Sequence, residues 1–420
     1  MQRRYGWIVL MVAAASMVGS LPGRTQGLGL ITEPLLADLA IDRVTYAALN
    51  FWATLIGSAG ALGIGYAIDR LGTRGVLTTV LLVLGLIVIA MSRSAGYAEL
   101  AVWITLTRAV GQSALSVVSL AIVGHWFVRR IDTAMAIYSV AISIGFMAAF
   151  PLVGYAVQGF GWRAAWMGIG VALAGALAPA AWMIVRRNPE SMGLLPDAGK
   201  PSPPQPARPD GEILAGYAWT QALAMPSFWV FAIGTALYGL VASGIGLFNE
   251  SVLAERGFRP EVYYQTLAVT ALTALIGNFL GGWLAHKVAL GRLMAASLFI
   301  LSTGLLAFPF VTTLMQVWMW AAAMGLGGGL VMVLFFSVWG RLFGRRHLGR
   351  IQGVAQALTV VASAIGPLLL AWTLERTGSY AAIFEILAAV IAGTAVAALL
   401  VSLPGPPPVL APAPRGGAAG

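Results

Sequence analysis

Long apolar runs dominate this sequence of 420 residues. A helix needs roughly 20 apolar residues to cross the hydrocarbon core of a bilayer, and we find twelve runs of about that length. These runs are too long and too continuously apolar to be strands of a membrane barrel. The sequence therefore predicts an all-α membrane protein with twelve transmembrane helices. Their approximate bounds are 6–31, 46–67, 76–92, 98–124, 134–157, 164–185, 227–249, 263–285, 293–311, 315–339, 352–373 and 380–402.

Charged residues are too few to cover a soluble globule of this size. They make up 10% of the chain, against 59% hydrophobic residues, whereas a soluble domain carries about 25% charged residues. This composition argues against a soluble enzyme, a disordered protein or a coiled coil. The chain has no cysteine, and its three histidines are not spaced to share a metal ion. We therefore predict no catalytic residue, no metal site and no cofactor.

The basic residues between the runs indicate how the chain crosses the membrane. Placing both termini in the cytoplasm leaves 17 Lys and Arg residues on the cytoplasmic side and 6 on the other side. This is the asymmetry that membrane insertion favours. The sequence thus predicts a multi-pass protein of the inner or plasma membrane with cytoplasmic N- and C-termini. The net charge of +10 follows from this topology, so we expect no nucleic-acid partner.

The two halves of the chain match each other at nearly one sequence offset. Residues 125–130 (HWFVRR) resemble residues 341–346 (RLFGRR) at an offset of 216. Residues 161–165 (GWRAA) resemble residues 378–382 (GSYAA) at an offset of 217. Parallel repeats of this kind build transporters with a central site between two halves. We therefore predict two pseudo-symmetric bundles of six helices each.

This repeat divides the chain into four predicted parts. They are an N-terminal six-helix bundle over 1–185, a cytoplasmic linker over 186–226, a C-terminal six-helix bundle over 227–402 and a tail over 403–420. The linker contains the segment PSPPQPARP, whose prolines exclude a helix. The tail is rich in proline, glycine and alanine, and we expect it to be disordered in the cytoplasm.

One loop carries a specific resemblance to a known family. Residues 65–74 read GYAIDRLGTR, and this pattern, GxxxDRxGxR, resembles the loop between helices 2 and 3 of the major facilitator superfamily. The resemblance implies two bundles that rock about a central site. It also implies a gating role for Asp69, Arg70 and Arg74, which would latch the two halves together in the outward-open state. These residues lie too close to the inner mouth to bind substrate.

A set of shorter elements is similar to a narrower branch, the monocarboxylate porters and their bacterial oxalate/formate relatives. The wider resemblance covers residues 1–402, and the narrower one depends on several elements found in order. They are Gly6-Trp7, Pro22-Gly23-Arg24, His125-Trp126-Phe127, Gly161-Trp162-Arg163, Gly366-Pro367 and Gly378-Ser379-Tyr380. This resemblance implies a small carboxylate as substrate.

Arg24 lies about two-thirds of the way along the first predicted helix. An arginine near the centre of a bilayer costs on the order of 3 kcal/mol on insertion scales, so it normally faces a bundle interior or a water-filled cavity. Its planar guanidinium matches a carboxylate in bidentate fashion, and we predict that Arg24 binds an anionic substrate. The alternative is an arginine at the outer interface that reaches the headgroups or pairs with Glu33. Monocarboxylate porters carry a lysine near this point, which supports the substrate role.

Arg108 begins a polar stripe on the fourth predicted helix. Gln112 and Ser116 follow it at i+4 and i+8, so the three side chains share one helix face. A polar stripe on a membrane helix faces a cavity or another helix, and we predict that Arg108, Gln112 and Ser116 contact substrate. The alternative comes from the superfamily, in which an arginine in a similar motif stabilises helix packing or handles protons.

Charge balance indicates the class of substrate. We find no acidic residue at mid-membrane in the first half, so an anionic ligand would neutralise Arg24 and Arg108. In the second half we predict that Tyr238, Asn278 and Phe335 line the same site. The alternative for Phe335 is a position that faces lipid or packs against another helix. Asn278 stands where the monocarboxylate relatives carry an arginine, and their usual aspartate falls at Ala274. This departure favours exchange or facilitated movement over proton symport.

The sequence therefore predicts a secondary transporter that moves a small organic anion by alternating access. No GxxxxGK[ST] loop is present, so the driving force is a gradient of a coupled proton or of a counter-anion. We expect a monomer in the lipid bilayer. One alternative is an exporter of apolar or drug-like compounds, which would need an acidic cavity. Another is a transporter-like receptor without flux. An intramembrane enzyme is disfavoured because the histidines lie at helix ends.

Overall fold

The structure is a computed structural model of the full chain. It describes residues 2–59, 64–127, 131–186, 216–344 and 348–405. Within these ranges the backbone is almost entirely helical, and the one β-bridge joins Gly216 to Gly344.

The N-terminal half contains long helices interrupted by short 3-10 and π segments. Several of these elements follow one another with only a few residues, or none, between them. In chain order the elements are α1 (Gln2–Gly19), η1 (Leu21–Gly23), α2 (Thr25–Gly29), α3 (Thr32–Leu39), α4 (Arg43–Ser58), α5 (Ile64–Met91), α6 (Tyr97–Thr107), η3 (Arg108–Ala114), α7 (Leu115–Trp126), α8 (Ile131–Ala172), η4 (Leu173–Leu177) and α9 (Ala178–Ile184).

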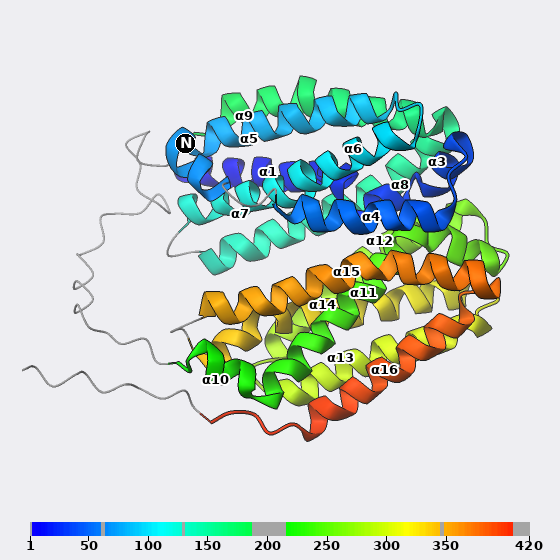
Figure 1. The fold of residues 1–420 in the computed structure, drawn as a ribbon. Helices are drawn as coiled ribbons and strands as arrows, with labels where there is room; N and C mark the ends of the chain where they lie inside the picture. Colours follow the sequence, from blue (N-terminus) through cyan, green and yellow to red (C-terminus); the bar gives the residue numbers. More distant parts are fainter. Residues whose placement is uncertain (1, 60–63, 128–130, 187–215, 345–347, 406–420) are drawn as a thin grey trace, which may run out of the picture.

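The C-terminal half repeats this plan after a short helix. Its elements are α10 (Trp219–Ala224), α11 (Pro226–Glu255), α12 (Pro260–Leu284), α13 (Leu290–Ala307), η7 (Phe308–Phe310), α14 (Leu314–Phe343), α15 (Leu348–Thr377) and α16 (Ala381–Leu400). Figure 1 shows the N-terminal helices in an upper bundle and the C-terminal helices in a lower one.

The number of membrane-crossing segments agrees with the sequence prediction. Ten helices of the described residues are long and apolar enough to cross a membrane. The longest, Thr133–Ile184, spans 52 residues and turns at Gly161, where φ is 81° and ψ is 159°. Dividing it there and adding α4, which has only 16 residues, gives the twelve expected segments.

The first helix is broken, which corrects the prediction of one continuous span over 6–31. α1 ends at Gly19, and Arg24 has an extended backbone with φ of −92° and ψ of 151°. Pro22 lacks an N–H for a helical hydrogen bond. Gly23 packs so closely on the η3 region that a Cβ would come within 2.3 Å of Thr107 O. The chain therefore leaves the helix here and resumes it in α2.

The connections between some predicted spans are also shorter than expected. α5 continues through the predicted loop 68–75 and turns only at Gly72, where φ is 77°. A glycine adopts this left-handed φ without the steric cost that a Cβ brings. In the predicted linker 186–226, α10 is helical, while residues 187–215, which include the proline-rich segment, lie outside the described residues. Most of the predicted tail, 406–420, lies outside them too. The non-helical proline-rich segment, the disordered tail and the domain bounds therefore stay predictions.

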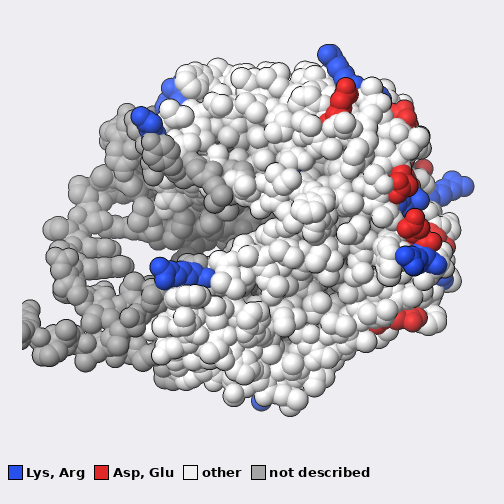
Figure 2. Space-filling view, in the orientation of Figure 1, with Lys and Arg blue, Asp and Glu red and all other residues white. Residues whose placement is uncertain are grey.

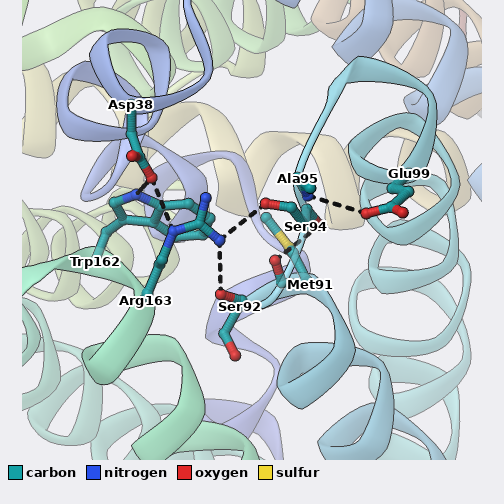
Figure 3. A network of polar contacts seen from close by, with 8 residues as sticks. All are labelled: Asp38, Met91, Ser92, Ser94, Ala95, Glu99, Trp162 and Arg163. Carbon is teal, nitrogen blue, oxygen red and sulfur yellow. Dashed lines mark hydrogen bonds and ion pairs between the residues drawn. The ribbon is translucent and has the colours of Figure 1, made fainter.

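The internal repeat is visible in two corresponding turns. Gly161 and Gly378 both have positive φ, 81° and 73°. Asp38 of α3 accepts hydrogen bonds from Trp162 Nε1 at 3.0 Å and Arg163 Nε at 2.8 Å just after the first of these glycines. Arg163 also donates to the carbonyl oxygens of Ser92 and Ser94, just after α5, so it ties this turn to α3 and to the connection between α5 and α6 (Figure 3).

The matching turn of the C-terminal bundle is held in the same way. Glu255, at the end of α11, accepts hydrogen bonds from Ser379 Oγ at 2.6 Å and from the Tyr380 backbone N–H at 2.9 Å. Asp38 and Glu255 are 217 residues apart, which is the offset between Gly161 and Gly378. One carboxylate thus fastens each turn, and the repeat extends to this detail.

The two ends of the molecule differ in charge. The acidic side chains visible in Figure 2 gather at the right-hand end, at helix ends and connections. We call this the acidic end. The described carboxylates in or beside the helix ends there are Glu33, Asp38, Asp42, Glu99, Glu255, Glu261, Glu375 and Glu385, and Glu250 lies further inside α11. We call the opposite end, where the N-terminus lies in Figure 1, the basic end.

The two bundles meet at the acidic end and separate at the basic end. α4 packs against α15, and α8 packs against α12. Gly29 of α2 lies so close to α11 that a Cβ would come within 2.1 Å of Gly246 O. Gly154 of α8 lies against the Tyr264 ring of α12 in a similar way. Figure 2 shows a cleft between the bundles that opens at the opposite, basic end.

Candidate functional site

Arg24 lies at the break of the first helix, between η1 and α2. Its Nε donates to Ser20 Oγ at 2.7 Å, and its Nη2 contacts Met17 Sδ at 2.9 Å and Ser116 Oγ at 3.2 Å. The guanidinium also lies over the Phe146 ring, 5.3 Å from the ring centroid. Residues of α1, α7 and α8 therefore hold this cation inside the N-terminal bundle, and these contacts are all with neutral groups.

Arg108 is buried more deeply, with 2% of its surface exposed. Its Nη1 donates to Thr25 Oγ1 and to Gln112 Oε1, each at 2.8 Å. Its Nη2 donates to Asn50 Oδ1 at 2.9 Å. The Nε is buried and has no hydrogen-bond partner. Like Arg24, this arginine is bound by neutral oxygens.

The two arginines occupy neighbouring places along one helix face. Gln112 binds Arg108, while Ser116, one turn further on, binds Arg24. Thr25, next to Arg24 in the chain, also binds Arg108. Residues 108–114 form a π-helical segment, a local widening that is frequent at functional sites. The stripe Arg108, Gln112 and Ser116 thus faces the broken first helix.

Two carboxylates of the described residues pair with arginines other than Arg24 and Arg108. The two ion pairs seen there are Arg43 with Glu33, at 2.5 Å, and Arg163 with Asp38, at 2.8 Å. Glu33 is therefore bound to Arg43 and does not neutralise Arg24. The positive charges of Arg24 and Arg108 are accommodated without a hydrogen-bonded carboxylate among these residues.

The site residues predicted in the second half lie in or against α14. A Cβ on Gly328 of α14 would come within 2.5 Å of the Tyr238 hydroxyl. The neighbouring Gly329 lies against the backbone N of Asn278. Phe335 is buried and packs edge-on against Phe336, with ring centroids 5.1 Å apart. The hydrogen bonds of Arg24 and Arg108 all end within the N-terminal half, so contact of both sets with one substrate stays a prediction.

The gating residues lie at the turn within α5. Arg74 Nε donates to Trp182 O at 2.8 Å, and its guanidinium lies 3.9 Å above the centroid of the Trp182 ring. Arg70 is exposed. The side chain of Asp69 lies outside the described residues. Arg74 thus contacts its own bundle in this structure, and the latch between the halves stays a prediction.

Several residues that hold the arginines were missed by the sequence reasoning. The clearest is Asn50, which the sequence shows as a single amide inside an apolar run and which faces Arg108. Thr25 and Ser20 are small hydroxyl residues beside Arg24, and a search for acceptors near that arginine would have found them. Met17 and Phe146 carry no sequence feature that sets them apart from other apolar residues.

The sequence profile of the Major Facilitator Superfamily matches residues 6–321 and 231–419 of this chain. The chain therefore belongs to the Major Facilitator Superfamily, as the loop motif and the repeat predicted. It is a multi-pass membrane transporter and not an enzyme.

Two curated relatives align along nearly the whole chain. Monocarboxylate transporter 13 of Rattus norvegicus is 23% identical over 413 residues, which cover 95% of this chain and 89% of that protein. Monocarboxylate transporter 11 of Mus musculus is 27% identical over 403 residues, which cover 91% of this chain and 84% of that protein. The chain is thus similar to the branch that its short sequence elements indicated.

Solved structures share the fold. A bacterial homologue of the human lysosomal transporter Spinster, in an inward-facing and unoccupied conformation, matches with a TM-score of 0.67 and 17% identity over 94% of each chain. The same homologue in an inward-facing and occupied conformation gives a TM-score of 0.67 over 94% of this chain and 92% of that one. At this level of identity the likeness concerns the fold alone.

Proposed function

We propose that this transporter carries a small organic anion, with a carboxylate as the group bound by Arg24 and Arg108. The observation that carries the proposal is that both guanidiniums lie inside one bundle with neutral partners only. A buried charge is costly unless it is paired, and arginines inside membrane proteins mark ligand or ion pathways. An anion that enters the cleft would supply the missing negative charge.

The chemistry of the two arginines favours a carboxylate over a diffuse anion. A guanidinium binds a carboxylate through two parallel N–H···O bonds. Arg24 donates hydrogen bonds to the hydroxyls of Ser20 and Ser116. These neutral acceptors bind a guanidinium less strongly than a carboxylate does, so a carboxylate would displace them. The curated relatives that align with the whole chain are named monocarboxylate transporters, which supports the same class of substrate.

The charge at the two ends supports an orientation in the membrane. Cytoplasmic segments carry an excess of Lys and Arg, so we place the basic end and both termini in the cytoplasm of a plasma or inner-membrane protein. The cleft in Figure 2 then opens toward the cytoplasm. The substrate would reach Arg24 from the cytoplasm, or leave it, through this cleft. Closure of the basic end would accompany opening of the acidic end.

A thermal-shift titration of the purified protein with mono- and dicarboxylates tests the proposal. We expect carboxylates to raise the unfolding temperature in a concentration-dependent way, since ligands that bind only the folded state stabilise it. Arg24→Gln should weaken this response by at least about tenfold in concentration, because it removes a charge that pairs with the ligand.

Arg93→Gln is the matched control. Arg93 is exposed in the connection between α5 and α6, so the same loss of charge there should leave the titration unchanged. A normal response in Arg24→Gln would remove Arg24 from the site. Stabilisation by lipophilic cations and not by carboxylates would instead support an exporter of drug-like compounds.

A further inference from the structure

Glu250 of α11 is a carboxylate that the proposed transport of anions leaves unused. Its side chain is half-buried, and its Oε2 atom is buried without a hydrogen-bond partner. Neither of the two ion pairs seen among the described residues includes it. An ionised carboxylate in such a place loses hydration and gains no partner, which is costly, whereas the protonated acid avoids most of this cost.

The charged groups around Glu250 increase that cost. Glu33 of α3 and Glu261 of α12 are the carboxylates whose charges act on it. Glu33 is already bound to Arg43 of α4, so that arginine is engaged elsewhere. Glu261 is exposed at the start of α12. The negative charges of Glu33 and Glu261 therefore oppose ionisation of the half-buried Glu250.

The uncharged side of this environment is formed by tyrosines. Tyr263 and Tyr264 of α12 lie near Glu250, and Tyr46 of α4 lies near Tyr263. The hydroxyl groups of Tyr46 and Tyr263 are buried without a hydrogen-bond partner. Several polar groups are thus deprived of water together where the two bundles meet.

Glu250 also lies where the bundles must separate. Gly246, one helical turn earlier, packs on Gly29 of the N-terminal half. Phe248, between these two positions on α11, has a non-helical backbone with φ of −115° and ψ of 19°. This break sets off the last turns of α11 from the rest of the helix. Opening of the acidic end would carry Glu250 into water.

We propose that Glu250 is a proton-binding site whose occupancy stabilises the closed acidic end. The carboxylate takes a proton from the medium while this end is open, and the neutral acid is then buried as α11 closes against α2 and α3. When the end reopens, the acid is hydrated and releases its proton to the medium. This proposal rests on the proposed function only because it requires the two ends to open alternately. The proton site lies at the acidic end and is distinct from a coupling site at the midplane.

The absence of cysteine from the chain allows a direct test of this gate. Ala37 of α3 and Glu375 of α15 line one cavity of about 460 Å³ at the acidic end, from opposite bundles. Spin labels on Ala37→Cys and Glu375→Cys report the distance between the bundles by pulsed electron paramagnetic resonance. We expect a short distance in acid and a growing population with a longer distance as the pH rises. The ratio of the two should change by up to tenfold per pH unit, the limit for one linked proton.

Variants of Glu250 separate its proton from other pH effects. Glu250→Gln mimics the neutral acid, so the short distance should persist at every pH, whereas Glu250→Asp should keep the pH dependence. Glu385→Gln is the matched control, because Glu385 is exposed at the start of α16, and it should behave like the labelled parent protein.

Two results would overturn the proposal. One is a distance distribution in the parent that does not change with pH, and the other is an unchanged pH dependence in Glu250→Gln. Folding is checked in each variant by size-exclusion chromatography and by the thermal unfolding curve. No substrate is present in this experiment, so its failure leaves anion binding by Arg24 unaffected, and a failed carboxylate titration leaves the proton site unaffected.

Discussion

Gly23 should tolerate no side chain, because the broken first helix touches the backbone of η3 at this point. A Cβ at Gly23 would lie 2.3 Å from Thr107 O, 2.9 Å from Gln112 N and 3.1 Å from Gly111 Cα. A carbon and a carbonyl oxygen in contact are normally more than 3 Å apart, so Gly23→Ala forces the two backbones apart by roughly 1 Å. The next residue is Arg24, and the displacement therefore reaches the proposed site.

The expected effect is a loss of both stability and ligand response. Forcing an extra methyl group into a packed interior costs typically 1–3 kcal/mol, and here the neighbours are backbone atoms that cannot turn away. We expect the unfolding temperature of Gly23→Ala to fall by several degrees. The carboxylate concentration that gives half of the thermal shift should rise by at least about tenfold, since a shift of about 1 Å spoils the hydrogen bonds of the guanidinium.

Gly124→Ala is the matched control for this substitution. Gly124 lies in α7, and a Cβ there would meet no atom within 4 Å. Alanine is favoured over glycine within a helix by about 1 kcal/mol, so this variant should be as stable as the parent or more stable. If Gly23→Ala unfolded at the parental temperature and bound carboxylates normally, the close approach of η1 to η3 would be refuted.

Two smaller effects concern the acidic end. Asp38→Asn should lower the free energy of unfolding by about 1 kcal/mol or less, because the pair with Arg163 is over a third exposed and such pairs contribute little; a double-mutant cycle with Arg163→Gln measures this coupling. The pKa of Asp42 lies below its usual value, chiefly because Thr45 donates a hydrogen bond to it, so its cap on α4 is present above about pH 4 and is lost as the pH falls through the folded-state pKa. Asp42→Ala should therefore cost roughly 0.5–1 kcal/mol near neutral pH and less in acid, as thermal unfolding at several pH values will show.

The membrane fold could be predicted from the sequence because its main determinant is local. Each crossing segment is an apolar run of its own, so that its presence, though not its exact ends, follows from local composition. The internal repeat predicted two bundles, and its matching segments 161–165 and 378–382 form corresponding turns in the structure. The gating loop motif added the family, which the match of the superfamily profile to residues 6–321 and 231–419 confirmed.

The details of the candidate site depended on contacts between distant residues. The break at Pro22 and Gly23 has a local cause, the missing N–H of Pro22, and a distant one, the packing of Gly23 on Thr107, 84 positions away in the chain. The stripe from Arg108 to Ser116 was expected to face a cavity or another helix. Nothing local indicated that Asn50, 58 positions before Arg108, would hold its guanidinium. Short-range sequence patterns predicted Arg24 and Arg108 as site residues, but the residues that surround them are visible only in the folded structure.

The break in the first helix has a consequence for selectivity. Arg24 has an extended backbone between two helical pieces, and its side chain is held by two hydroxyls, a thioether and an aromatic ring, all of which bind it weakly. In the proposed site, any solute must displace these groups before it reaches the guanidinium. Apolar solutes gain nothing by that exchange, while an anion gains a full charge interaction. The groups that contact Arg24 would then select solutes by charge before the shape of the solute affects binding.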